Sequence, residues 1–145
     1  MIVHTGVSEA APSLIVEPEQ VMVVGEAASV VNSRLHALTL TSPLVLVLFD
    51  EAVGFAPALA LGQRSAGRRI AGYCLVYPGL IDPVALPSST ADWPDAPVCI
   101  AAVEDEGSAS ARLARLHGWE FITAQTPAAL ADAISHWGMN RRLNL

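Results

Sequence analysis

Three short runs of the sequence are apolar at nearly every position, and they constrain the fold more than any other feature. The runs are LVLVLF at residues 44–49, IAGYCLVY at residues 70–77 and VCIAAV at residues 98–103. A strand with one face in water alternates apolar and polar residues, whereas a strand buried on both faces is apolar throughout. The three runs therefore predict central strands of a parallel sheet that helices cover on both faces.

Patterns typical of helices separate these runs. They lie at residues 18–38, 52–64, 108–117 and 126–137. In the first, apolar residues recur at steps of three and four. In the last, Thr126 is a natural N-cap and Pro127 stands at the first helical position. Shorter or weaker strand patterns lie at residues 1–5, 13–16 and 120–123. The alternation predicts a single α/β domain over residues 1–145, with about four or five mostly parallel strands.

The composition indicates a folded cytoplasmic protein. Of the 145 residues, 52% are hydrophobic and 15% are charged, which is too apolar for a disordered chain. No apolar run approaches the roughly 18 residues that a membrane-spanning helix needs. Residues 1–13 have neither the basic region nor the long apolar region of a signal peptide. We therefore expect a cytoplasmic location and no membrane contact.

The charged residues argue against nucleic-acid binding. The net charge is −6 and every basic residue is Arg, so the basic surface that such binding requires is missing.

The two cysteines, Cys74 and Cys99, lie inside strand-like runs and are expected to be buried free thiols. They have no metal-ligand spacing, and no cofactor is expected.

Acidic residues follow two of the apolar runs. Asp50 and Glu51 end the first run, and Glu104, Asp105 and Glu106 end the third. The carboxyl ends of parallel strands share one edge of the sheet, and ligands of open α/β sheets bind outside that edge. The sequence therefore predicts a gathering of carboxylates where a site is expected.

From about residue 42 to 137 the chain resembles the C-terminal half of an α/β-hydrolase of the thioesterase-like branch. PLVLVLFDEAVGFAPALALGQR resembles the nucleophile-elbow strand with its helix, and GRRIAGYCLVYPGLIDP resembles the next strand. WPDAPVCIAAVEDE resembles the strand that delivers the triad acid, and TPAALADAISHW resembles the closing helix. The resemblance implies a three-layer sandwich around a short, mostly parallel sheet, with the proline-rich residues 78–97 as a lid-like insertion.

The chain departs from that family at the catalytic positions. In place of G-x-S-x-G it reads Phe49-Asp50-Glu51-Ala52-Val53, so Glu51 takes the serine's position and Phe49 and Val53 replace both glycines. Bulky residues disfavour a strained positive-φ turn, which predicts a relaxed one.

The triad itself is also incomplete. Asp105 stands where the triad acid is expected, but residues 123–126, where the histidine should follow, contain none. Without serine and histidine the chain is not expected to act as a serine hydrolase.

Three other interpretations draw on short motifs. GVSEA contains Ser8 in a G-x-S-x-A pattern, with His4 nearby in sequence as a candidate base. VHTG at residues 3–6 resembles the oxyanion loop of these hydrolases, so that residues 1–5 would be the oxyanion strand. A receiver domain with Asp50 as its phosphorylated residue is excluded, because receivers need a lysine and the chain has none.

Three hypotheses remain open for the acidic residues Asp50, Glu51, Glu104 and Asp105. They are solvated N-caps of the following helices, which the helix dipole favours. Alternatively, they hold a divalent cation, although no ligand spacing marks one. In the third hypothesis Glu51 is a general acid or base, and Asp50 and Asp105 are further catalytic candidates.

The third hypothesis also assigns a binding cleft. The Ala52 N–H would bind an oxyanion, and Tyr77 and Trp93 would line the cleft under the proline-rich segment. Two functions follow as expectations. The first is a non-catalytic binding or accessory protein for a small acyl or polyketide-like molecule, free or carrier-bound, or for a partner protein. The alternative is an acid–base isomerase, dehydratase or cyclase of a biosynthetic pathway that uses Glu51.

The resemblance covers only the C-terminal half of a hydrolase, so the strands of the first half of the sheet would be missing. Their absence would leave an edge strand unprotected, and unprotected edge strands pair with other chains. The sequence therefore predicts a homodimer.

Overall fold

A computed structural model describes residues 2–4, 33, 43–77, 92–103 and 108–144 of the chain. Its elements are β1 (Ile2–His4), β2 (Leu44–Phe49), the 3₁₀ helix η2 (Asp50–Phe55), α2 (Ala56–Ser65), β3 (Ile70–Tyr77), β4 (Val98–Ala102), α3 (Ala109–His117), β5 (Glu120–Thr123) and α4 (Pro127–Leu143). The expected strand at 13–16, nearly all of the expected helix at 18–38, most of the proline-rich insertion and the acidic residues 104–106 lie outside the described residues.

The five strands form one sheet in the order β1-β2-β3-β4-β5. The four strands β2 to β5 run parallel, and β1 pairs antiparallel with β2. Every residue of β4, and every residue of β2 except Phe49, is buried. The prediction of central parallel strands in an α/β fold is thus confirmed. We call the edge where β2 to β5 end the carboxyl edge, and the edge where they begin the amino edge.

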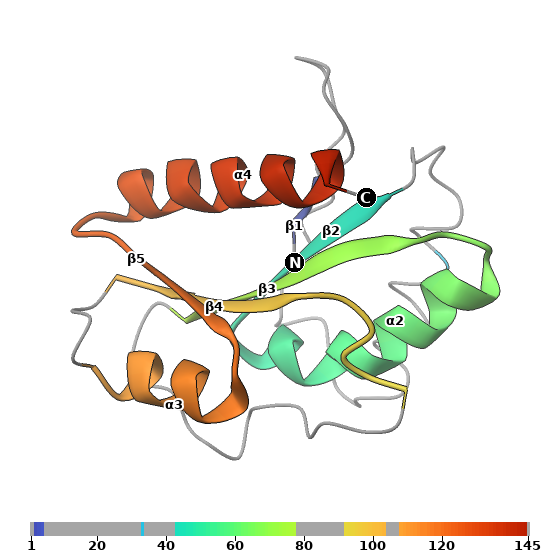
Figure 1. Cartoon of the computed structure of the whole chain (residues 1–145), viewed down its shortest axis with the longest axis horizontal. Helices are drawn as coiled ribbons and strands as arrows, with labels where there is room; N and C mark the ends of the chain where they lie inside the picture. Colours follow the sequence, from blue (N-terminus) through green and yellow to red (C-terminus); the bar gives the residue numbers. More distant parts are fainter. Residues whose placement is uncertain (1, 5–32, 34–42, 78–91, 104–107, 145) are drawn as a thin grey trace.

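Helices lie on both faces of this sheet (Figure 1). α2 and α3 lie on one face, where they enclose a core that includes Leu46, Tyr73 and Ile100. α4 lies on the other face, where Ile134 and Trp137 belong to a second core. Neighbouring strand residues point to opposite faces, so strands that are apolar at every position supply both cores.

Side-chain caps define two of the helices. The Ser108 hydroxyl accepts a hydrogen bond from the Ala111 N–H at 3.2 Å, and α3 ends at Gly118, whose φ of 68° is left-handed. The Thr126 hydroxyl accepts one from the Ala129 N–H at 3.2 Å. The expected starts of both helices are confirmed, and α4 continues beyond the expected end at Trp137.

Two expectations need correction. The helix expected from residue 52 is first a 3₁₀ turn, and the α-helix begins only at Ala56, where Pro57 stands in its first turn. The strand at residues 1–5 exists as β1, but its antiparallel pairing sets His4 opposite Val45 at the start of β2. This pairing differs from the mostly parallel arrangement that the sequence predicts, and residues 5 and 6 of the VHTG motif lie outside the described residues. None of the described helices is long and apolar enough to cross a membrane.

Candidate functional site

The expected site at the carboxyl edge begins directly after β2. Phe49 has an extended backbone, with φ −108° and ψ 142°, and Asp50, Glu51 and Ala52 form the first part of η2. A 3₁₀ helix uses negative φ angles, so Glu51 does not occupy the strained conformation of a nucleophile elbow. The relaxed turn that the sequence predicts is the one observed.

The other expected site residues are spread over this edge and the core. Tyr77 is the last residue of β3, beside Ala102 of β4, so its backbone also lies at the carboxyl edge. β3 separates the ends of β2 and β4, which places them about 10 Å apart. Asp105, Glu104 and Glu106 lie outside the described residues, as do the side chains of Asp50, Glu51, Ala52 and Tyr77.

Trp93 lies in the core. Its side chain is 1% exposed and packs edge-on against Tyr73, with ring centroids 5.6 Å apart, and against Trp119, at 5.9 Å. Within the described part of the chain, its indole N–H has no hydrogen-bond partner. Trp93 therefore joins the proline-rich segment to the α2–α3 face of the sheet.

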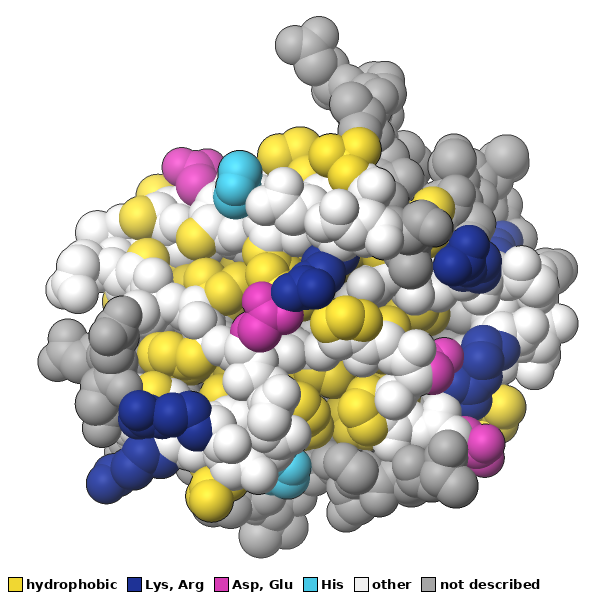
Figure 2. Space-filling model, viewed as in Figure 1, with side chains coloured by type: hydrophobic (Ala, Val, Ile, Leu, Met, Phe, Trp, Pro, Cys, Tyr) yellow, Lys and Arg dark blue, Asp and Glu magenta, His cyan; other side chains and the backbone are white. Residues whose placement is uncertain are grey.

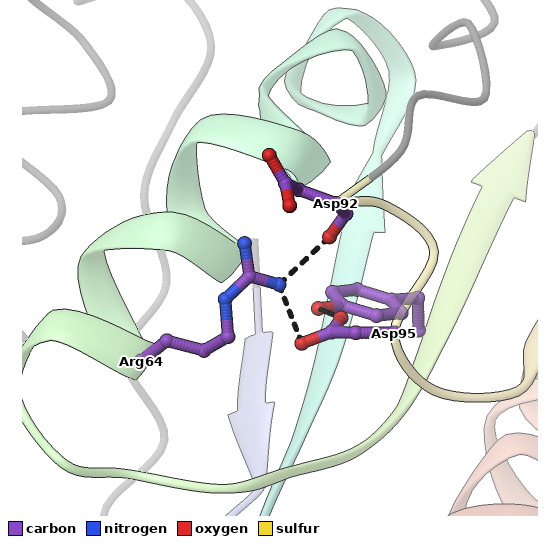
Figure 3. A network of polar contacts seen from close by, with 4 residues as sticks. Arg64, Asp92 and Asp95 are labelled. Atoms are coloured by element: carbon purple, nitrogen blue, oxygen red, sulfur yellow. Dashed lines mark hydrogen bonds and ion pairs between the residues drawn. The ribbon is translucent and has the colours of Figure 1, made fainter.

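A polar network lies nearer the amino edge, and sequence reasoning missed it. Arg64 in the last turn of α2 donates from Nη1 to Asp95 Oδ2 at 2.7 Å and to the Asp92 carbonyl at 2.8 Å (Figure 3). The Tyr73 hydroxyl, from β3, donates to the other oxygen of Asp95 at 2.6 Å. One carboxylate thus joins a helix, a strand and the segment that leads into β4.

The three groups have complementary charge states. Burial raises the pKa of Tyr73, and its hydrogen bond to Asp95 raises it further, so Tyr73 stays a neutral donor. Burial also raises the pKa of Asp95, but the hydrogen bonds from Tyr73 and Arg64 outweigh this effect and the net pKa is lowered. The hydrogen bond to Asp95 raises the pKa of Arg64. The arrangement favours an ionised Asp95 that accepts from Tyr73 and Arg64, and such a group is suited to stabilising the fold.

A cavity of about 390 Å³ adjoins this network at the amino edge. Arg64, Arg68, Arg69 and Asp95 line it together with small and apolar residues such as Ile70 and Pro97. A second hollow of about 240 Å³ is also lined by Arg64, together with Pro57, Leu61 and Trp93 among others. The volume of the larger cavity falls at the low end of the range for small-molecule sites.

The backbone turn between α2 and β3 positions the arginines beside this cavity. α2 ends in a turn at Gly67, whose φ of 71° is a left-handed conformation that favours glycine. The Arg68 N–H donates to the Gln63 carbonyl at 2.9 Å, and Arg68 Nη1 donates to Gln63 Oε1 at 3.1 Å. The Arg69 carbonyl accepts from the Leu44 N–H at 2.8 Å, which ties the turn to the start of β2.

A sequence signal for this site existed. In alternating α/β chains, the end of a helix and the start of the next strand fall at the amino edge. Arg64, Arg68 and Arg69 precede β3, and Asp95 precedes β4. The topology of the sheet therefore brings all four residues to the amino edge. Ligands of open α/β sheets usually bind at the carboxyl edge, so the sequence did not predict a site among these residues at the amino edge.

Elsewhere the described surface offers no obvious metal or nucleic-acid site. No group of three His, Cys, Asp or Glu side chains within the described ranges is placed to hold a metal ion. On the face shown in Figure 2, arginines are scattered and acidic side chains lie among them, so the described part of this face has no continuous basic surface.

No protein-family model, no curated protein and no solved structure matches the chain. The hydrolase resemblance therefore rests on the motifs and element order alone.

Proposed function

We propose that the chain is a non-catalytic binding or accessory protein with a three-layer, α/β-hydrolase-like architecture. Its ligand is a small acyl or polyketide-like molecule, free or carrier-bound, or a partner protein. The observation that carries this proposal is the 3₁₀ turn at Asp50–Phe55, which stands where serine hydrolysis needs a strained nucleophile turn.

The order of elements supports the architecture. β2 leads into η2 and α2, and then follow β3, β4, α3, β5 and the closing helix α4. This is the order that the hydrolase resemblance implies, with the proline-rich segment between β3 and β4.

The loop between β5 and α4 supports the loss of the triad. It consists of Ala124, Gln125 and Thr126, and the Thr126 hydroxyl already caps α4. None of these side chains titrates near neutral pH, so none can carry a proton as the triad histidine does.

The alternative is an acid–base enzyme that uses Glu51. The observation in its favour is position: Glu51 directly follows the buried strand β2, at the edge where α/β proteins bind ligands. An isomerase, dehydratase or cyclase needs one positioned proton-transfer group and no nucleophile.

One experiment separates the two functions. Native mass spectrometry of the purified protein should identify a bound small molecule, which is then incubated with the wild type, with Glu51→Gln and with Asp132→Asn. Asp132 is exposed on α4 and serves as the control. For a binding protein the molecule is recovered unchanged from all three. Turnover by the wild type that falls about 100-fold or more in Glu51→Gln alone would establish the enzyme instead.

We also propose that the protein is a cytoplasmic homodimer without nucleic-acid or membrane partners. Within the described sheet β5 pairs only with β4, so its outer side offers a strand edge to a second copy. The two buried cysteines are free, as the reducing cytoplasm favours. Light scattering should give twice the 15.2 kDa of one chain, and a mass of one chain would contradict the dimer.

A further inference from the structure

The cavity at the amino edge has the opposite charge to the chain as a whole. Of the eight basic residues in the sequence, three line this cavity, and Asp95 is the acidic residue among its lining. The lining therefore carries an excess of positive charge in a protein whose net charge is −6. A concave surface of one sign concentrates field lines and attracts ligands of the other sign.

The remaining lining is apolar or small. Ile70, Ala71, Ala96 and Pro97 contribute hydrocarbon surface beside the guanidinium groups. Small-molecule sites combine such apolar walls with a few polar groups that fix the ligand's orientation. The volume of about 390 Å³ is that of a small-molecule site.

The walls are held in place without a ligand. Asp95 fixes Arg64 through a hydrogen bond of 2.7 Å, and Gln63 fixes Arg68 through one of 3.1 Å. Because these arginines are already ordered, binding a ligand costs less conformational entropy than ordering free side chains would. Guanidinium groups also present paired N–H donors that match carboxylate and phosphate oxygens.

We propose that this cavity binds a small organic anion, a carboxylate or phosphate group attached to a short apolar part. The anionic group lies against Arg68 and Arg69, and the apolar part lies along Ile70 and Pro97. The site is at the opposite edge of the sheet from Asp50 and Glu51, so it does not depend on the function proposed there.

Calorimetric titration with three probes tests the proposal. Hexanoate carries a carboxylate on a short chain, inorganic phosphate carries charge without a chain, and hexanamide carries the chain without charge. We expect at least one anion to bind the wild type measurably and hexanamide to bind at least about tenfold more weakly, because hydrogen bonds to charged groups are the stronger ones.

Variants locate the binding. The double variant Arg68→Gln/Arg69→Gln should weaken anion binding about tenfold or more, whereas Arg112→Gln, an exposed arginine on α3, should leave it unchanged. Urea midpoints equal to that of the wild type show that the fold of each variant is intact. The proposal is wrong if neither anion binds, if hexanamide binds as well as the tighter-binding anion, or if the double variant binds that anion like the wild type.

Discussion

Asp95 is the residue on which three parts of the molecule converge. Its two carboxylate oxygens accept from Arg64 on α2 and from Tyr73 on β3. Removal of this ionised group leaves the buried Tyr73 hydroxyl without its acceptor, whereas Arg64 keeps its hydrogen bond to the Asp92 carbonyl. Hydrogen bonds to a charged group contribute about 1.5–3 kcal/mol each when the site is buried, and less where solvent screens the partner. Tyr73 lies in the buried part of this network and Arg64 in the exposed part.

The raised pKa of Tyr73 predicts a loss of stability at high pH. The folded protein holds the phenolic proton more tightly than the unfolded chain, whose tyrosine pKa is 10.0. The contribution is therefore fully present below pH 10 and is lost as the pH rises above it, by up to about 1.4 kcal/mol per pH unit. Urea unfolding at pH 9 and pH 11 should show a larger fall for the wild type than for Tyr73→Phe. Equal falls in the two proteins would contradict this assignment.

The lowered pKa of Asp95 acts at the other end of the pH scale. The unfolded carboxyl has a pKa of 3.8 and the folded one is lower, so its contribution is present above pH 3.8 and is lost as the pH falls through the folded value. The effect does not overlap with that of Tyr73, and near neutral pH both contributions are complete.

The polar network of Arg64, Tyr73 and Asp95 was harder to predict than the strands and helices that carry it. The strands at 44–49, 70–77 and 120–123 follow from local apolar patterns, and the starts of α3 and α4 follow from Ser108 and Thr126. Arg64, Tyr73 and Asp95 carry no such local signal. Each is ordinary in its own segment, and only the pairing of β3 with β4 and the position of α2 bring them together.

At the scale of elements, α4 contacts the sheet through the second core, and one close contact and one group of polar side chains add to this packing. Trp137 Nε1 donates to Glu120 at 3.1 Å, and Arg141 pairs with the same carboxylate. The Arg141 guanidinium also lies 5.5 Å from the centroid of the Trp137 ring. The ring itself lies over Gly72 of β3, where a Cβ atom would come within 2.7 Å of Trp137 Cη2.

Two glycine substitutions on either side of this interface should have opposite effects. Gly72→Ala forces the Trp137 ring or the strand to move and should destabilise the protein by about 1–3 kcal/mol. Gly138→Ala, in α4, meets Val45 at an ordinary 3.6 Å and should be neutral or stabilise by up to about 1 kcal/mol, because alanine favours the helix. Urea unfolding of both variants gives the comparison. A harmless Gly72→Ala would mean that the helix does not pack this closely.

At the scale of the whole molecule, two cores lie back to back across one sheet. Cys74 and Cys99 are cross-strand neighbours in the α4-side core, and both are 0% exposed. Burial raises the pKa of the Cys99 thiol, and its hydrogen bond with Cys74 raises it further. Thiols react as thiolates, so burial protects both side chains from reagents, and the raised pKa protects Cys99 further.

Thiol labelling should therefore report global unfolding. In native buffer we expect a disulfide reagent to modify Cys74 and Cys99 only when the central strands open, so that the opening free energy equals the urea unfolding free energy. In concentrated urea both thiols should react at once. Rapid modification of either thiol in the native protein would show that the sheet opens locally between β3 and β4.

Each of β2, β3 and β4 pairs with the strand that follows it in the chain, so a growing polypeptide can add these strands to the sheet one by one as it leaves the ribosome. β1 likewise pairs with the next described strand, but this pair is antiparallel and cannot form until Leu44–Phe49 has been synthesised. Of the described strands, a ribosome stalled before β2 would thus carry β1 without its partner. One stalled after β3 would already carry the first parallel pair, and with it the strand beside which β4 is added.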